Sequence, residues 1–251
     1  MPDPHFSRSA DELKQIAKDV LDYAVKRGAG AAETEVSEGT GQTVTVRQGE
    51  VETIEYNRDK GIGVTVYIGQ QRGHASTTDF SPQAIRDTVD AALSIARFTA
   101  ADDCAGLADP DMLASDIPDL DLWHPWGLTV ERAIELAKAC ETAGFAVDKR
   151  LTNSEGATVS TQGSHFIYGN TLGFLAGYAG SRHGLWCALI AGKGDEMQRD
   201  DWYETSRDPG ELPDPASVGR RAGERAVSRL AGRKIATTQA PVVFEAPIAS
   251  S

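Results

Sequence analysis

Residues 40–78, TGQTVTVRQGEVETIEYNRDKGIGVTVYIGQQRGHASTT, decide the fold of this chain. Apolar and polar residues alternate in three parts of this stretch, so each part offers one face to a core and the other to water or a partner layer. The alternation predicts antiparallel strands around residues 44–46, 54–56 and 62–68. Short glycine-containing sequences predict tight turns at residues 48–50, 58–61 and 70–73.

Composition argues against several classes of protein. The net charge of −12 over 251 residues disfavours non-specific binding to nucleic acid or an anionic membrane, because both require Lys and Arg. No apolar run is long enough to span a bilayer, and residues 1–10 do not resemble a secretory signal. The three cysteines lie far apart without a CxxC motif, which indicates reduced thiols. We therefore expect a cytoplasmic protein with no nucleic-acid or membrane partner.

Helices are predicted before and after each strand-rich region. Ser9 and Glu12 form a capping box, Ser81 precedes Pro82 at a second helix start, and Thr129 caps a third helix. A last helix is expected near residues 216–230. Further strands are expected near residues 33–37, 157–168, 174–180, 184–192 and 197–205, with a turn at 162–163. This order predicts an α+β fold: an antiparallel multi-stranded sheet flanked by helices, in two loosely similar α-β-α lobes.

Two segments lie outside the predicted helices and strands. Residues 99–128 are rich in Asp and Pro, and so long a connection in a compact domain usually has a function or wraps a surface. Residues 237–239 read as a linker, and residues 240–244 as the start of a strand. We therefore expect one N-terminal domain over residues 1–236, with 237–251 forming a linker and the first strand of a missing C-terminal domain.

A search for catalytic motifs predicts no catalytic, cofactor-binding or metal-binding residue. The sequence has no HExxH, HExxxH, GxSxG or GxxxxGK[ST] motif. Two GxG fragments, at residues 39–41 and 61–63, lack the third glycine and a following helix, so they are interpreted as strand and turn glycines.

No individual residue is favoured for metal binding or catalysis. His124 and Asp121 could contribute to a metal site, but no third ligand can be named, and a solvated loop with a docking tryptophan is favoured. His74, His165 and His183 are interpreted as structural, and Cys187 as a core thiol. Cys104 is the cysteine to test for reactivity, although its acidic neighbours disfavour a thiolate.

Two charged clusters are interpreted as solvated faces. The aspartates of residues 102–121 lack the spacing and glycine of an EF-hand loop. Arg221, Arg225 and Arg229 recur at four-residue spacing and could face nucleic acid or a partner, but pairing with Glu224 and other nearby acids is favoured.

Longer phrases of the sequence resemble the TldD/PmbA family of zinc proteases, in its PmbA/TldE branch without HExxxH. The matching phrases, which together cover most of the chain, are GEVETIEYNRDKGIGVTVYIG (49–69), ASTTDFSPQAIRDTVDAALSIARFTAADDCAGLAD (75–109), PDLDLWHPW (118–126), DKRLTNSEGATVST (148–161) and QRDDWYE (198–204).

The resemblance implies an N-terminal α/β domain followed by a mostly β domain. It also implies that a TldD-type subunit carries HExxxH and the zinc, and that the PmbA-type subunit pairs with it to cleave unfolded or modified peptides, including leader removal. No cofactor is then expected in this chain. No catalytic residue carries over, because no catalytic motif of the family matches any position.

Three functions remain open at this point. The first is a non-catalytic subunit whose sheet and long loop shape a chamber with a TldD-type partner, where strand edges hold an extended peptide. The second is a non-proteolytic interaction module, such as a modulator of DNA gyrase. The third is a metal-independent enzyme that uses Cys104 or His124.

Overall fold

A single antiparallel sheet of seven strands organises the computed structural model, which describes residues 6–249. The strand order is β3-β2-β1-β4-β6-β7, and the short β5 pairs with β4. The strands are β1 (Ala31–Arg47), β2 (Glu50–Ile68), β3 (Gln71–Thr77), β4 (Leu151–Asn170), β5 (Leu175–Ala176), β6 (Ala179–Ala191) and β7 (Gln198–Ser206). The helices are α1 (Ala10–Lys26), α2 (Pro82–Phe98), α3 (Val130–Phe145), α4 (Pro215–Ser228) and the one-turn α5 (Ala246–Ala249).

The helix starts are those that the sequence predicts. Ser9 and Glu12 form the capping box of α1, with the side chain of each bonded to the backbone of the other. Ser81 and Thr129 accept a backbone N–H at the starts of α2 and α3. Asp214 does the same for α4, with Pro215 in the first turn.

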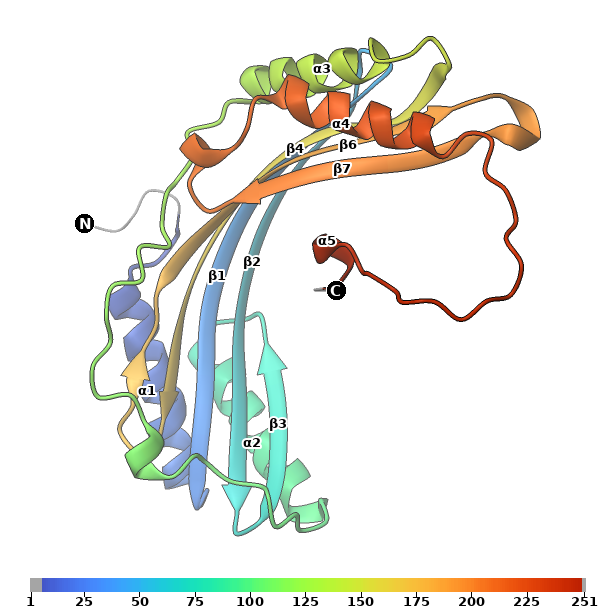
Figure 1. Cartoon of the computed structure of the whole chain (residues 1–251). Coiled ribbons are helices and arrows are strands. Elements are labelled where there is room, and N and C mark those ends of the chain that lie inside the picture. The colour runs from blue at the N-terminus through green and yellow to red at the C-terminus, as the bar shows by residue number, and fades with distance from the viewer. Residues whose placement is uncertain (1–5, 250–251) are drawn as a thin grey trace.

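Both helix pairs cover the same face of the sheet, at opposite ends of its long strands. Along β1 the buried side chains are even-numbered throughout, so Val36 and Val44 lie on one face. Val36 belongs to a core with α1 and α2, whereas Val44 belongs to a separate core with α3 and α4. Figure 1 shows the strands bent into an arc, with α1 and α2 near one end and α3 and α4 near the other. The predicted α+β fold with two similar lobes on one sheet is confirmed.

The strands are longer than predicted, because two predicted turns are wrong. Residues 58–61 continue β2, where Arg58 pairs with Thr40 and Asp59 with Gly39. Gln162–Gly163 likewise continues β4, paired on both sides to β1 and β6. Ladder bonds to β1 hold both segments extended, whatever their local turn preference. The turn predicted at 48–50 is confirmed as a hairpin turn between β1 and β2. The hairpin predicted at 70–73 exists, but its turn is Gly69 and Gln70, and residues 71–73 already pair with residues 66–68 as the start of β3.

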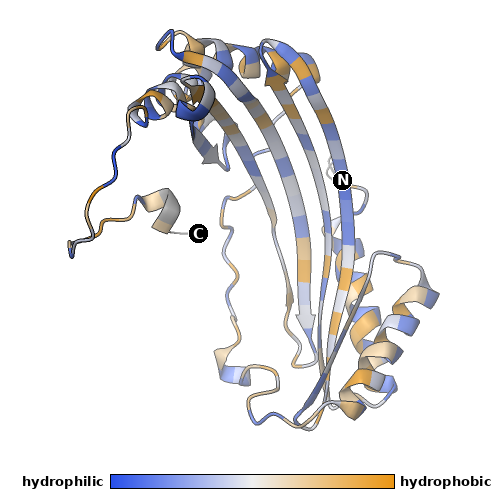
Figure 2. Cartoon of the chain, turned by 90° about the vertical axis from the view of Figure 1, so that its right-hand side faces the viewer, coloured by the Kyte–Doolittle hydropathy of each residue, from blue (hydrophilic) through white to orange (hydrophobic). Residues whose placement is uncertain are grey.

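The opposite face of the sheet is polar, and neither of the two helix-containing cores formed by residues 6–249 lies on it. Along β1 the odd-numbered residues are partly or fully exposed and include Glu35, Ser37 and Thr43. Figure 2 shows hydrophilic and hydrophobic residues alternating along the long strands. We call this surface the open face.

The two irregular segments behave differently. Residues 99–128 contain only the short 3-10 helix Pro110–Met112, as expected from their composition. Residues 231–245 form neither helix nor strand, so residues 240–244 are not paired here. The prediction that they begin a further domain stays a prediction. Within the described residues, no helix is long and apolar enough to cross a membrane.

Candidate functional site

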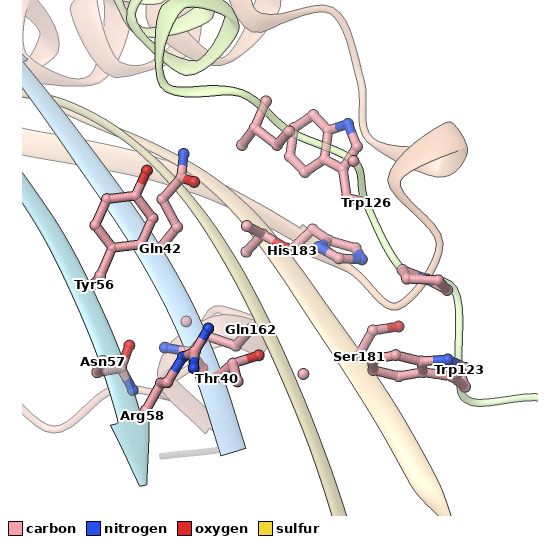
Figure 3. A pocket seen from close by; sticks show the side chains of 16 residues that line it. Thr40, Gln42, Tyr56, Asn57, Arg58, Trp123, Trp126, Gln162, Ser181 and His183 are labelled. Carbon is pink, nitrogen blue, oxygen red and sulfur yellow. Dashed lines mark hydrogen bonds between the residues drawn. The ribbon is translucent and has the colours of Figure 1, made fainter. Parts of the chain in front are cut away.

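No helix of the described residues covers the middle of the helix-bearing face, and a cavity of about 350 Å³ lies there. Its floor comes from neighbouring strands, because Gln42 pairs with Thr161 and Thr161 pairs with His183. Residues paired directly across antiparallel strands share a face. Tyr56 and Arg58 of β2 form one wall, and residues 123 and 125–128 form the other (Figure 3). We call this cavity the mid-sheet pocket.

Backbone contacts with Ser181 of β6 fix the loop wall. The Ser181 N–H donates to the carbonyl of Leu122 at 2.9 Å, and the His124 N–H donates to the Ser181 hydroxyl at 2.9 Å. That hydroxyl lies 2.8 Å from the carbonyl of Arg207 and can donate to it. The predicted loop therefore runs along β6 as an additional edge segment.

Gly163 of β4 allows Trp123 to approach the sheet closely. A Cβ at this position would lie 2.7 Å from the Trp123 ring, so any residue other than glycine would displace the indole. Phe6 packs against the same ring at a centroid distance of 5.0 Å. The docking tryptophan predicted for this loop is thus confirmed.

His183 is held by hydrogen bonds at both ring nitrogens. Nε2 lies 2.9 Å from the carbonyl of His124, so it carries the proton and donates. Nδ1 lies 2.9 Å from the Thr161 hydroxyl and therefore accepts. Burial lowers the pKa of His183, which favours this neutral form. Both ring nitrogens thus have partners within the protein, which agrees with the interpretation of His183 as a structural histidine.

Gln42 and Arg58 are two polar residues of the pocket that have unused hydrogen-bonding or charge capacity. Gln42 is 9% exposed, and its Nε2 has no hydrogen-bond partner among the described residues. Arg58 is exposed and makes no ion pair within the described part of the chain. Figure 3 shows both side chains on the same side of the β1–β2 pair.

A buried carboxylate next to the pocket ties the N-terminal segment to the sheet. Glu38 accepts hydrogen bonds from the backbone N–H groups of Ser7 and Arg8 and from both of their side chains. Burial opposes ionisation, but these donors outweigh it and hold the pKa of Glu38 below its usual value. Phe6 stacks on His165 at a centroid distance of 4.0 Å. His165 is therefore part of a structural contact, as predicted.

The remaining predicted candidates lie apart from the pocket floor. His124 borders it through its backbone, while its ring Nε2 faces the carbonyl of Asp121 at 2.9 Å, a hydrogen bond that raises its pKa. His74 is exposed, with Nδ1 3.1 Å from the Thr65 hydroxyl. Cys104 is exposed in the loop, and Cys187 is buried as predicted.

The arginine stripe of α4 packs against β7. Arg221 and Arg225 lie over the ring of Trp202, at 3.8 and 5.2 Å from its centroid. Arg225 and Arg229 also pair with Asp200. The prediction that acids neutralise this stripe is confirmed for these two arginines, although the partner is Asp200 of β7 rather than Glu224.

The described residues do not fit a resident zinc ion, which needs three or four His, Cys, Asp or Glu ligands. No three such side chains come together among residues 6–249 that the structure describes. His124 Nε2 approaches Asp121 Oδ1 at 3.5 Å, and His165 Nε2 approaches Glu38 Oε2 at 3.6 Å. Each pair supplies two ligands without a third among the described residues, and the carboxylate of Glu38 already has its own donors, so neither pair is a preformed metal site.

Sequence reasoning missed the mid-sheet pocket. Its polar residues are distant in sequence and become neighbours only through strand register. The one local signal was Trp123 and Trp126 in a segment without regular structure, since two large aromatics in a loop need a surface to pack on.

Comparisons with known proteins agree on the family. Residues 32–96 match domain 1 of the PmbA/TldA metallopeptidases, and residues 123–230 match their central domain. "Metalloprotease PmbA" of Escherichia coli O157:H7 is 44% identical over 238 residues, which are 95% of this chain and 53% of that protein. The Haemophilus influenzae homologue is 41% identical over 233 residues, 93% of this chain and 51% of the relative. The chain thus spans about half the length of these curated relatives.

Solved structures share the fold. A candidate modulator of DNA gyrase from Bacteroides thetaiotaomicron superposes with a TM-score of 0.82 at 23% identity, over 90% of this chain and 52% of that one. TldE from Thermococcus kodakarensis gives a TM-score of 0.69 at 14% identity, over 84% of this chain and 47% of that one. With the sequence matches, these similarities lead to one conclusion: the chain belongs to the PmbA/TldD metallopeptidase family.

Proposed function

We propose that this chain is part of a non-catalytic, PmbA/TldE-type subunit that works with a zinc-carrying TldD-type subunit to process peptides. The observation that carries the proposal is the free edge of β2. Residues 62–68 pair with β1 and β3, whereas residues 50–61 pair with β1 alone among the described residues.

A free strand edge can add an extended polypeptide as a further strand, since its outward N–H and C=O groups are unpaired. Exposed apolar side chains line this edge at Val51, Ile54 and Tyr56. The adjoining open face carries a groove of about 760 Å³ with charges of both signs, including Asp59 and Arg182. These surfaces suit binding of peptide or partner rather than bond cleavage by this chain.

Affinity capture tests the choice of partner. The tagged chain is expected to recover a TldD-type subunit from a lysate of its own source, identified by mass spectrometry. Recovery of DNA gyrase without a TldD-type subunit would overturn the proposal. It would favour the alternative suggested by relatives described as candidate gyrase modulators, a non-proteolytic interaction module.

A matched pair of variants tests the role of the β2 edge. Ile54 on this edge is 44% exposed and Ile95 on α2 is 47% exposed, so both can become Lys without burying a charge. In the assembled complex with the TldD-type subunit, Ile54→Lys is expected to slow cleavage of unfolded casein at least several-fold. Ile95→Lys is expected to leave it unchanged. Equal rates for both variants would remove the β2 edge from the proposal.

A further inference from the structure

We propose that the mid-sheet pocket binds the C-terminal residue of a peptide, with the carboxylate at Arg58 and Gln42 and an apolar side chain between the aromatic walls. The choice of a peptide rests on the proposed function, whereas the carboxylate and the apolar group follow from the pocket itself. Its volume of about 350 Å³ is at the small end of ligand pockets, which span roughly 300–1,000 Å³.

The charge of the pocket is opposite to that of the chain. The chain carries a net charge of −12, yet the 16 residues that line this cavity include no Asp or Glu. Arg58 is the charged residue among them, because His183 is held neutral. The nearest carboxylate on this face, that of Glu38, is already bonded to Ser7 and Arg8, and a guanidinium that makes no ion pair among the described residues favours a carboxylate ligand.

Gln42 adds a second polar contact. Its side chain is buried and its Nε2 has no partner among the described residues, a situation that costs free energy unless a ligand supplies the missing hydrogen bond. Gln42 pairs across the strands with Tyr56, and Arg58 pairs with Thr40. Gln42 and Arg58 are therefore diagonal neighbours on one face, about 7–8 Å apart at the backbone. Because Nε2 of Gln42 is shielded from solvent, the amide must turn its NH₂ toward the pocket for one carboxylate to meet both side chains.

The aromatic walls of the mid-sheet pocket favour an apolar group on the same ligand. Trp126 stands edge-on to His183 at a centroid distance of 5.5 Å, and Trp123 and Tyr56 complete the aromatic lining. An Asp or Glu side chain supplies a carboxylate but no large apolar group to pack against these walls. A C-terminal Phe, Leu or Trp carries both groups on one residue. Tyr56 and Arg58 belong to the free edge of β2, so the preceding peptide residues can leave the pocket over that edge.

Calorimetric titration of the isolated chain tests the proposal with two matched probes. Acetyl-Ala-Ala-Phe with a free C-terminal carboxylate is expected to bind at least 10-fold more tightly than the same peptide with a C-terminal amide. Arg58→Gln should abolish this preference by weakening the acid and not the amide. Arg86→Gln, which removes an exposed arginine of α2, is the control and should leave both affinities unchanged.

Gln42→Met separates binding from folding. Met has a similar shape without the unpaired amide, so the variant should be at least as stable as the wild type in urea while binding the acid peptide at least 3-fold more weakly. Equal binding of acid and amide peptides, or an unchanged affinity in Arg58→Gln, would overturn the proposal. Phenylpropionate binding as tightly as the acid peptide would overturn the peptide as ligand. Because no partner subunit is present, these results are independent of the capture experiment.

Discussion

Glu141 of α3 is expected to hold the β1–β2 hairpin in place through its carboxylate. The side chain is 2% exposed, and its two oxygens accept the backbone N–H groups of Gln48 and Gly49, each at 2.8 Å. These two residues form the turn between β1 and β2 and have φ angles of +53° and +79°. A two-residue hairpin loop of this kind requires positive φ at both positions, so its outward N–H groups need an acceptor.

Glu141→Gln removes about one of these two bonds, because the amide oxygen still accepts while the amide NH₂ faces the second N–H. A hydrogen bond to a charged group contributes about 1.5–3 kcal/mol, so we expect the free energy of unfolding to fall by about that amount. This loss is a large fraction of the roughly 5–15 kcal/mol that stabilises a folded domain. Glu141→Ala leaves both N–H groups without their acceptor and should cost more.

Urea denaturation measures the loss, and hydrogen exchange locates it. Exchange should accelerate first at the amides of Gln48 and Gly49, with the amide of Val20 in α1 as an internal reference. Glu135→Gln is the matched control, because Glu135 lies on the same helix in an exposed ion pair with Arg132 that is worth at most about 1 kcal/mol. A change below about 0.5 kcal/mol for Glu141→Gln would refute the reasoning.

Three further predictions follow from close packing and from two shifted pKa values. Gly219→Ala should destabilise the chain by about 1–3 kcal/mol in urea, because the added Cβ would lie 1.8 Å from the carbonyl oxygen of Cys140, where α4 crosses α3. The pKa of Glu38 is lowered in the folded protein, so the stabilisation from its ionised form is present above about pH 4.5 and is lost as the pH falls through the folded-state pKa. Glu38→Gln should therefore flatten the decline in urea stability between about pH 6 and about pH 3. Burial and a hydrogen bond to Glu33 raise the pKa of Tyr67 to about 12, and Glu33→Gln should lower it in an absorbance titration.

Each of these three predictions has a control variant or a result that would contradict it. In Gly106→Ala the added Cβ has no atom within 4 Å, so this variant should leave the stability measured in urea unchanged. An equal effect of both glycine variants would contradict the packing argument. A Glu38→Gln variant with the same acid dependence as the wild type would remove Glu38 as the source of that dependence. An unchanged Tyr67 titration in Glu33→Gln would leave burial alone as the cause.

Local sequence signals predicted the helices and the fold class well. A capping residue such as Ser9 or Thr129 acts within one turn of its own position, and the apolar stripe that follows needs no distant partner to be recognised. Period-two alternation over residues 62–68 similarly identified a half-buried strand. These signals determined that the chain is an α+β protein with helices on an antiparallel sheet.

Strand length and the pocket were decided by tertiary structure. Residues 58–61 have turn-type composition, yet pairing with residues 37–40 keeps them extended, because ladder hydrogen bonds outweigh a local preference. Gln42, Arg58 and His183 meet only because the register of β2, β1, β4 and β6 brings their positions onto one face. Register depends on the whole sheet, so the sequence by itself determined the elements and their faces, whereas the pairing between distant strands decided where the free edge and the mid-sheet pocket lie.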